Sequence, residues 1–295
     1  MKSMKLVSVV SSIVLLFFIS NIIAYIYPDF LWHQSFGYQS LWLFVFKAKW
    51  IVFLCGFSIT WIFLTINTKI AQKVSNLTST VSAKDINTPF NALNIILKNW
   101  IENSIRNSSQ NLPMKIYKGL FKFLIIILAV FSGLMMKSWW QDIYAFIHQV
   151  EFGRLDPILN KEIAFYFFSI PFLENLQNWL LLITIITLAI VGWIYFSRNV
   201  LLTLLVNKTQ KGGIKTHIFL LFSLLFLIIA FGFYLELYQL PFIKRGVVFG
   251  AGFTDHNITL WAYKILGYLL VIQAFICFLW AFKRGLKTPI FEIIL

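Results

Sequence analysis

The side chains able to transfer protons or bind metal ions are few, and they lie in polar segments between long apolar runs. Carboxylates and imidazoles occur together on one side of the expected bundle, at Asp29, His33, His148, Asp156, Asp255 and His256. Such groups can act as general acids and bases or as metal ligands. They are scattered along the chain, however, without a histidine pair spaced i, i+4 or a Gly-x-Ser-x-Gly turn. We therefore expect caps and ion pairs from them, with no catalytic residue, no metal site and no cofactor, and a ligand or metal site is the alternative.

Two polar segments carry the most specific sequence in the chain. Residues 152–172 read FGRLDPILNKEIAFYFFSIPF, and residues 244–255 read KRGVVFGAGFTD. Each segment contains a basic and an acidic residue, which predicts a crossed ion pair, Arg154 with Asp255 or Arg245 with Asp156, that joins the segments as one outer cap. The candidate residues for this structural or partner-binding cap are Arg154, Asp156, Glu162, Arg245, Gly246, Gly250, Gly252 and Asp255.

Local signals predict the backbone of the first of these segments. Asp156 precedes Pro157, which favours an extended residue and an Asx turn. Asn160 is a candidate N-cap for a short helix with Glu162 in its first turn, and that helix should end near Pro171. Because such a helix is too short to cross a bilayer and too apolar for water, we expect it at the outer interface.

The second segment is rich in glycine, which raises the question of phosphate binding. Its glycine spacing fits neither a Rossmann turn nor a P-loop, so we expect close backbone approach or positive φ angles instead. Thr254 or Asp255 should cap the helix that follows, where a carboxylate also meets the positive end of the helix dipole.

Long apolar runs must position these segments. Hydrophobic residues make up 59% of the 295 residues, charged residues 12%, and the mean hydropathy is +0.80, which leaves too little polar surface for a soluble globule. About 20 apolar residues in a helix cross a hydrocarbon core of roughly 30 Å. We predict an all-α, polytopic transmembrane helical bundle with interfacial helices and ordered outer loops. Its six full spans are 6–27, 41–66, 119–136, 176–196, 217–234 and 260–282.

The predicted transmembrane domain covers residues 1–287 and is followed by a short separate segment, residues 288–295. The first run follows Lys2 and Lys5 as a signal peptide would, but no small-x-small cleavage site follows it, so we expect a retained helix. Residues 88–106 repeat apolar side chains at helical spacing, which predicts an amphipathic cytoplasmic helix that packs on the bundle, lies on the membrane or docks a partner. Residues 288–295 read as the start of a truncated seventh helix.

The charges of successive polar segments predict the orientation. Basic residues dominate the segments after the second, fourth and sixth runs, whereas the segment after the third run contains five acidic residues against three basic ones. Because Lys and Arg are retained on the cytoplasmic side, we expect a multi-pass protein of the plasma (inner) membrane with both termini in the cytoplasm. The net charge of +14 then indicates membrane lipids as partners, and no nucleic acid.

The two outer segments, together with WHQSFGY at 32–38, resemble the outer-loop sequences of uncharacterised protein family 0182, a family of large prokaryotic membrane proteins. The resemblance covers the whole chain. It implies about seven transmembrane helices followed by a long extracytoplasmic region. This chain ends where the seventh helix should begin, so it looks like an N-terminal fragment, one half of a split gene or a shortened relative. The family has no assigned activity, and the resemblance therefore adds more about fold than about function.

We expect an anchoring or organising membrane domain that presents its outer loops to partners, such as another membrane protein or a downstream exported domain. The alternative is a transporter or channel-like pathway for a lipid-like or small solute. The predicted spans contain no Asp or Glu at mid-depth, so coupling to protons or sodium has little to act on. An envelope enzyme that acts through the outer loops is the third possibility.

Overall fold

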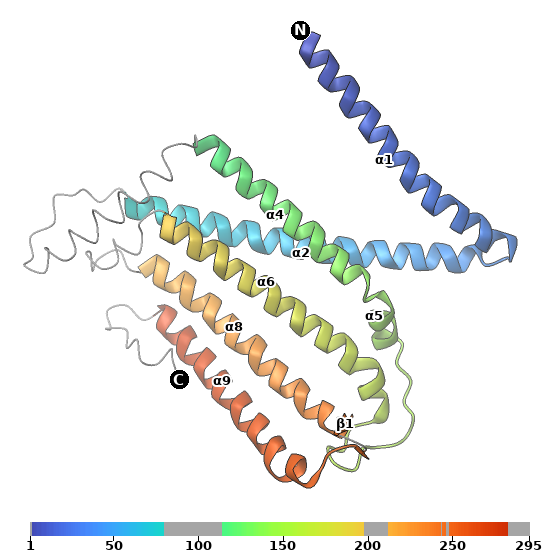
Figure 1. Ribbon diagram of the computed structural model, residues 1–295. Coiled ribbons are helices and arrows are strands. Elements are labelled where there is room, and N and C mark those ends of the chain that lie inside the picture. Colours follow the sequence, from blue (N-terminus) through green and yellow to red (C-terminus); the bar gives the residue numbers. More distant parts are fainter. Residues whose placement is uncertain (1, 80–113, 198–211, 243, 246–247, 283–295) are drawn as a thin grey trace, which may run out of the picture.

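The computed structural model describes residues 2–79, 114–197, 212–242, 244–245 and 248–282, and it is a helical bundle (Figure 1). The elements are α1 (Lys2–Ser35), α2 (Gln39–Ser79), α4 (Met114–Lys137), α5 (Trp140–Ile147), η2 (Phe165–Ser169), α6 (Ile170–Ser197), α8 (Gly212–Gln239), η3 (Leu240–Phe242), β1 (Lys244–Arg245), β2 (Val248–Phe249), η4 (Asp255–Thr259) and α9 (Leu260–Phe282). The prediction of an all-α polytopic bundle is confirmed, and the two-residue strands form a small antiparallel hairpin.

Five helices in the described residues are long and apolar enough to cross a membrane. They cover 39–75, 119–137, 165–196, 213–242 and 255–282, and each contains most or all of one predicted span. The predicted first span, 6–27, lies within α1, a further long helix that is not among these five. Residues 88–106 and 288–295 lie outside the described residues.

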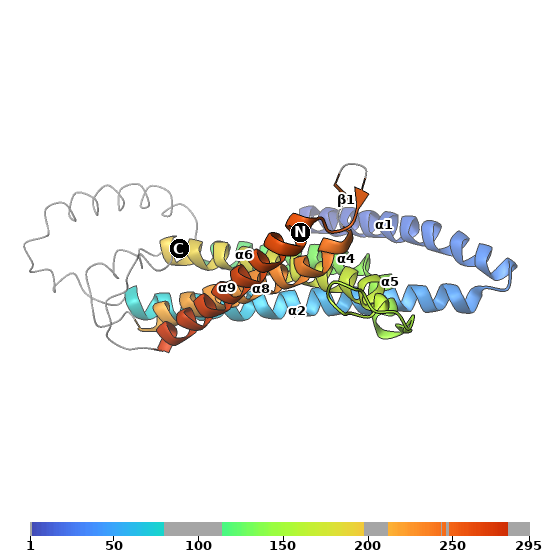
Figure 2. The ribbon, with the colours of Figure 1, turned by 90° about the horizontal axis from the view of Figure 1, so that it is seen from below.

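The helices pack as an array in which α8 lies between α6 and α9, and α2 packs against α4 and α6 (Figure 1). Figure 2 shows the same array after a quarter turn, with α1 diverging from the rest. Helix α9 is at one edge of the array. Only 17% of the residues in its most apolar stretch are buried, against 39% in the corresponding stretch of 165–196. Most apolar side chains of α9 therefore face outward from the chain, as lipid-facing side chains would.

The turn between α1 and α2 follows from its glycine. Gly37 has φ +78°, its N–H bonds to the Gln34 carbonyl at 3.0 Å, and the Tyr38 N–H bonds to the His33 carbonyl at 2.8 Å. This pair of bonds is the Schellman motif that ends many helices. Asp29 then accepts a hydrogen bond from Trp42 Nε1 at 2.5 Å and lies 3.6 Å from the His33 ring, so the predicted polar residues of this turn have structural contacts.

Two glycines allow α2 and α4 to approach closely. A Cβ at Gly133 would lie 2.8 Å from the backbone oxygen of Phe53, and one at Gly56 would lie 2.7 Å from Met136 Sδ. Small residues at such contacts are typical of helix packing in membranes, where apolar side chains gain nothing by leaving lipid.

Candidate functional site at the loop end of the bundle

The segments predicted to form the outer cap, 152–172 and 244–255, lie at the same end of the bundle, which we call the loop end (Figure 1). The first segment meets the end of α8 and η3, which come before the second segment, through aromatic rings. The Tyr166 ring lies 6.2 Å from the Tyr238 ring and 5.1 Å from the Phe242 ring, and the Phe165 ring lies 5.0 Å from that of Tyr238. These rings join a buried cluster that includes Leu260 from α9. The residues at the start of α6 therefore pack against the end of α8 and η3. We call the chain before α6 the first connection and the chain after α8 the second connection.

Asp156 organises the first connection. Its Oδ2 accepts hydrogen bonds from the N–H groups of Ile158 at 3.2 Å and Leu159 at 2.6 Å, and from the Tyr166 hydroxyl at 3.2 Å. The predicted Asx turn is confirmed. Asn160 closes the turn with a positive φ of 53° and does not cap a helix, because its left-handed backbone is incompatible with an N-cap. The N-cap prediction for Asn160 is therefore wrong.

Glu162 joins separate parts of the same connection. Its Oε1 accepts from the Phe152 N–H at 2.7 Å, and its Oε2 accepts from the Ala164 N–H at 2.5 Å at the start of the helix. The helix then continues through Pro171, contrary to the predicted end near that residue. Pro171 lies inside this continuous helix, directly after the π-helix η2, where the regular i to i−4 hydrogen-bond pattern is already interrupted. The predicted interfacial helix is thus the beginning of α6.

Asp255 organises the second connection. The residue is fully buried, its Oδ2 accepts from the Gly252 N–H at 3.0 Å, and its Oδ1 accepts from the Thr259 hydroxyl at 3.2 Å. A carboxylate in the first turn that reaches back to the preceding N–H is one half of a capping box. Gly250 has φ +118°, which agrees with the expected positive φ in this glycine-rich segment.

The crossed ion pairs were predicted from charge alone, and the described residues test only the pair of Arg154 with Asp255. Arg154 is exposed and makes no ion pair with Asp255 in the described part of the chain. The carboxylates of Asp156 and Asp255 accept hydrogen bonds from nearby N–H groups instead. Arg154 and Asp255, both among the described residues, form no ion pair, because buried backbone groups need acceptors more than an exposed guanidinium does. The sequence predicts that at least one of the two crossed pairs forms, so this stays a prediction through Arg245 and Asp156. The Arg245 side chain and Gly246 lie outside the described residues.

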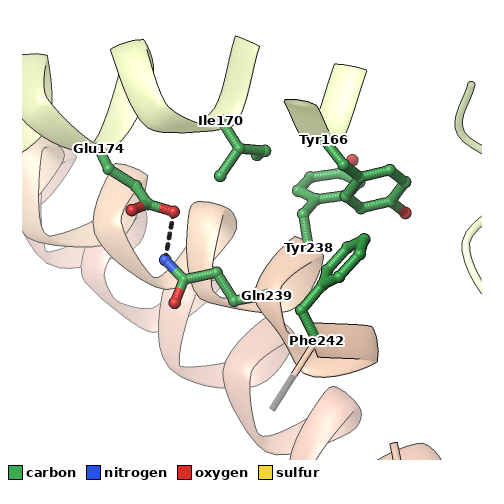
Figure 3. Close-up of a pocket in the computed structure, with 6 residues that line it drawn as sticks. All are labelled: Tyr166, Ile170, Glu174, Tyr238, Gln239 and Phe242. Atoms are coloured by element: carbon green, nitrogen blue, oxygen red, sulfur yellow. Dashed lines mark hydrogen bonds between the residues drawn. The ribbon is translucent and has the colours of Figure 1, made fainter. Parts of the chain in front are cut away.

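A pocket of about 380 Å³ opens between η2 with the start of α6 and the end of α8 with η3 (Figure 3). Its lining residues are Tyr166, Ile170, Glu174, Tyr238, Gln239 and Phe242. Glu174 and Gln239 lie at one end, where Gln239 Nε2 donates to Glu174 Oε1 at 2.5 Å, and the aromatic rings lie at the other end (Figure 3). Sequence reasoning missed Glu174 and Gln239, which are 65 positions apart and meet only through helix packing. Their position just beyond apolar runs was the available signal.

Buried polar networks hold the helices together within the bundle, and sequence reasoning missed them too. Ser132 bonds to Thr60 Oγ1 at 2.6 Å and accepts from Trp179 Nε1 at 2.7 Å, which links α4, α2 and α6. His217 bonds to the Tyr195 hydroxyl at 2.8 Å through Nδ1 and to Asn67 Oδ1 at 3.0 Å through Nε2.

The second network has a defined proton arrangement. Asn67 Nδ2 donates to the Phe63 carbonyl, so Asn67 Oδ1 is an acceptor and His217 Nε2 must carry a hydrogen. His217 Nδ1 then accepts from the Tyr195 hydroxyl in the neutral ring. All three side chains are buried and have hydrogen-bond partners, which indicates a role in helix association.

The histidines at the loop end, His148 and His256, are exposed. The described residues hold no group of three His, Cys, Asp or Glu side chains suited to a metal ion.

Comparison with known proteins places the chain in one family. The model of an uncharacterised protein family, UPF0182, matches residues 6–295. A UPF0182 protein of Trichodesmium erythraeum is 28% identical over 306 residues, covering 100% of this chain and 30% of the relative. One from Pelotomaculum thermopropionicum is 28% identical over 92% of this chain and 28% of its own length. One from Desulforamulus reducens is 30% identical over 85% of this chain and 27% of its own length.

The match therefore covers less than a third of the length of each of these three relatives. No solved structure matches it. The family match extends over nearly the whole chain, including both connections at the loop end, so the chain belongs to the uncharacterised protein family UPF0182.

Proposed function

We propose that this chain is an anchoring and organising membrane domain whose loop end binds another protein. The observation that carries the proposal is the contrast between satisfied polar groups and exposed apolar groups at the loop end. Asp156, Glu162 and Asp255 hold the backbone with internal hydrogen bonds. Phe253, Val150 and Leu155 nevertheless expose 85%, 71% and 65% of their surface.

A preorganised surface with exposed apolar side chains suits protein recognition. Loops fixed by internal hydrogen bonds lose little conformational freedom on binding, so more of the apolar contact energy appears as affinity. The occupant is another membrane protein, or a region corresponding to the remainder of the longer relatives. In the proposed orientation, the protein lies in the plasma (inner) membrane with both termini in the cytoplasm, and the loop end faces outward, in agreement with the alternating charge of the sequence.

The test is recovery of the native complex from membranes with an affinity tag on this protein. We expect a stoichiometric partner that is lost when Leu155 and Phe253 are both changed to Ser. The control is Tyr268→Ser on α9, a side chain with 70% exposure within a candidate span, which should leave the partner bound. Identical partner composition in the two variants would contradict the proposal.

Transport of a lipid-like solute is the second candidate function, and the pocket of the loop end is the observation that favours it. The pocket joins a polar end to an aromatic end, as a site for an amphipathic molecule would. Proteoliposomes distinguish the two functions. Movement of a fluorescent phospholipid between leaflets above the rate in protein-free liposomes would favour transport, whereas a rate equal to the protein-free rate favours anchoring.

A further inference from the structure

We propose that the loop-end pocket binds a primary ammonium group carried on an apolar body. The pocket is formed by the start of α6 and by the end of α8 with η3, so its walls belong to packed helices. This inference does not depend on the proposed anchoring function, because it concerns the occupant of a cavity and not the exposed apolar side chains of Leu155 and Phe253.

The polar end of the pocket offers acceptors. A carboxylate can only accept hydrogen bonds, and Glu174 uses Oε1 for the bond from Gln239 Nε2. Within the described residues, Glu174 Oε2 and Gln239 Oε1 make no hydrogen bond. Two unused acceptors at the same end of a half-buried site favour a ligand that donates several hydrogen bonds. A primary ammonium group, with three N–H donors, supplies them.

The charge at this end also calls for a cation. No ion pair involves Glu174 in the described part of the chain, and the neighbouring charged residue on α8, Glu236, is acidic as well. Lys161 lies over the Phe165 and Tyr238 rings at 5.6 Å and 6.0 Å and does not line the pocket. Hydrogen bonds between oppositely charged groups are stronger than those between neutral ones, which favours an ammonium group over a hydroxyl group.

The other end of the pocket suits an apolar body. The hydroxyl groups of Tyr166 and Tyr238 donate to Asp156 and Tyr234, so both rings are held in place and present their carbon surfaces (Figure 3). Ile170 lies between the rings and the carboxylate, and Phe242 completes the aromatic end (Figure 3). A volume of about 380 Å³ accommodates an alkylamine or the head group and first carbons of an aminophospholipid, two sources of the same chemistry.

The experiment measures binding of hexylammonium to the purified full chain in phosphatidylcholine nanodiscs by isothermal titration calorimetry, with empty nanodiscs subtracted. Glu174→Gln keeps an acceptor for Gln239 but removes the charge, and we expect it to weaken binding at least about tenfold. Glu151→Gln removes an exposed carboxylate from the same loop end of the bundle and should change the affinity for hexylammonium by less than about twofold. Circular dichroism of each variant verifies the helical fold.

Two further measurements keep the result decisive if Glu174→Gln fails to fold. Hexanol should bind the unmodified chain much more weakly than hexylammonium does, and Phe242→Leu, at a ring that is 55% exposed, should weaken hexylammonium a fewfold. Equal affinity for hexanol and hexylammonium, unaltered binding by Glu174→Gln, or no binding at all would overturn the proposal.

The two sources of the ammonium group are distinguished by adding phosphatidylethanolamine to the nanodiscs. If its head group is the occupant, the apparent Kd for hexylammonium should rise severalfold. If the Kd stays the same while binding still depends on Glu174, the occupant is a soluble amine. This competition is independent of partner recovery, so a failure here and a failure of the anchoring proposal can be told apart.

Discussion

Ser132 is a small side chain whose removal should lower the free energy of unfolding of the bundle markedly. Its hydroxyl group is bonded to Thr60 Oγ1 and accepts from Trp179 Nε1, and all three residues are at most 5% exposed. Ser132→Ala removes one oxygen and leaves two buried polar groups without their partner. An interhelical hydrogen bond in a membrane contributes about 0.6 kcal/mol on average and at most about 1.7 kcal/mol. We therefore expect a loss of about 1–3 kcal/mol in the free energy of unfolding.

The assay is equilibrium unfolding in mixed micelles, followed by Trp fluorescence and circular dichroism. Ser138→Ala is the matched control, because Ser138 is exposed and its hydroxyl group donates only to the carbonyl of Met135 three residues earlier. Trp179→Phe completes a double-mutant cycle with Ser132→Ala, and we expect a coupling energy above about 0.5 kcal/mol. A Ser132→Ala effect no larger than that of Ser138→Ala would refute the role assigned to this network.

Three other outcomes are expected. Gly133→Ala should lower the free energy of unfolding by about 1–3 kcal/mol in the same assay, because its Cβ would lie 2.8 Å from the Phe53 backbone oxygen. The control is Gly119→Ala, which has open space at its Cβ and should be neutral or stabilising. Asp255→Ala should speed hydrogen exchange at the start of η4 and cost about 1–2 kcal/mol, and unaltered exchange there would contradict its capping role. A cysteine at Asn160 should react with a membrane-impermeant reagent only from outside and one at Lys211 only from the cytoplasm, and labelling from the same side would contradict the predicted orientation.

The sequence predicted the helices well and their ends poorly. Apolar runs report the thickness of hydrocarbon to be crossed, whereas a helix ends where its backbone finds other partners. Helix α2 extends to Ser79, well beyond the predicted span 41–66, and Asn67, Ala71 and Ser75 are buried in this extension. In the same way, the π-helix η2 lets α6 begin before Pro171, and nothing in local residue preferences indicates that geometry.

The same distinction separates the contacts of the loop end that could be predicted from those that could not. The Asx turn at Asp156 was predictable because it depends on residues two and three positions away. The Glu174–Gln239 contact was not, because it depends on the packing of α6 against α8. Of the two candidate ion pairs, the one between Arg154 and Asp255 is absent from the described residues for a reason that is general at the end of a helical bundle. Each helix leaves unpaired N–H groups at its start, and a nearby carboxylate satisfies them over a short distance.

The same reasoning explains why the acids of the loop end are not equivalent. Asp156, Glu162 and Asp255 have oxygens that accept from backbone N–H groups of their own connection, so they maintain the shape of the loops. Glu174 makes its one hydrogen bond to a side chain on another helix, and its second oxygen is directed to no backbone group among the described residues. A carboxylate that is not needed for capping, and that lies between packed helices beside an aromatic cavity, is the one available to a ligand (Figure 3).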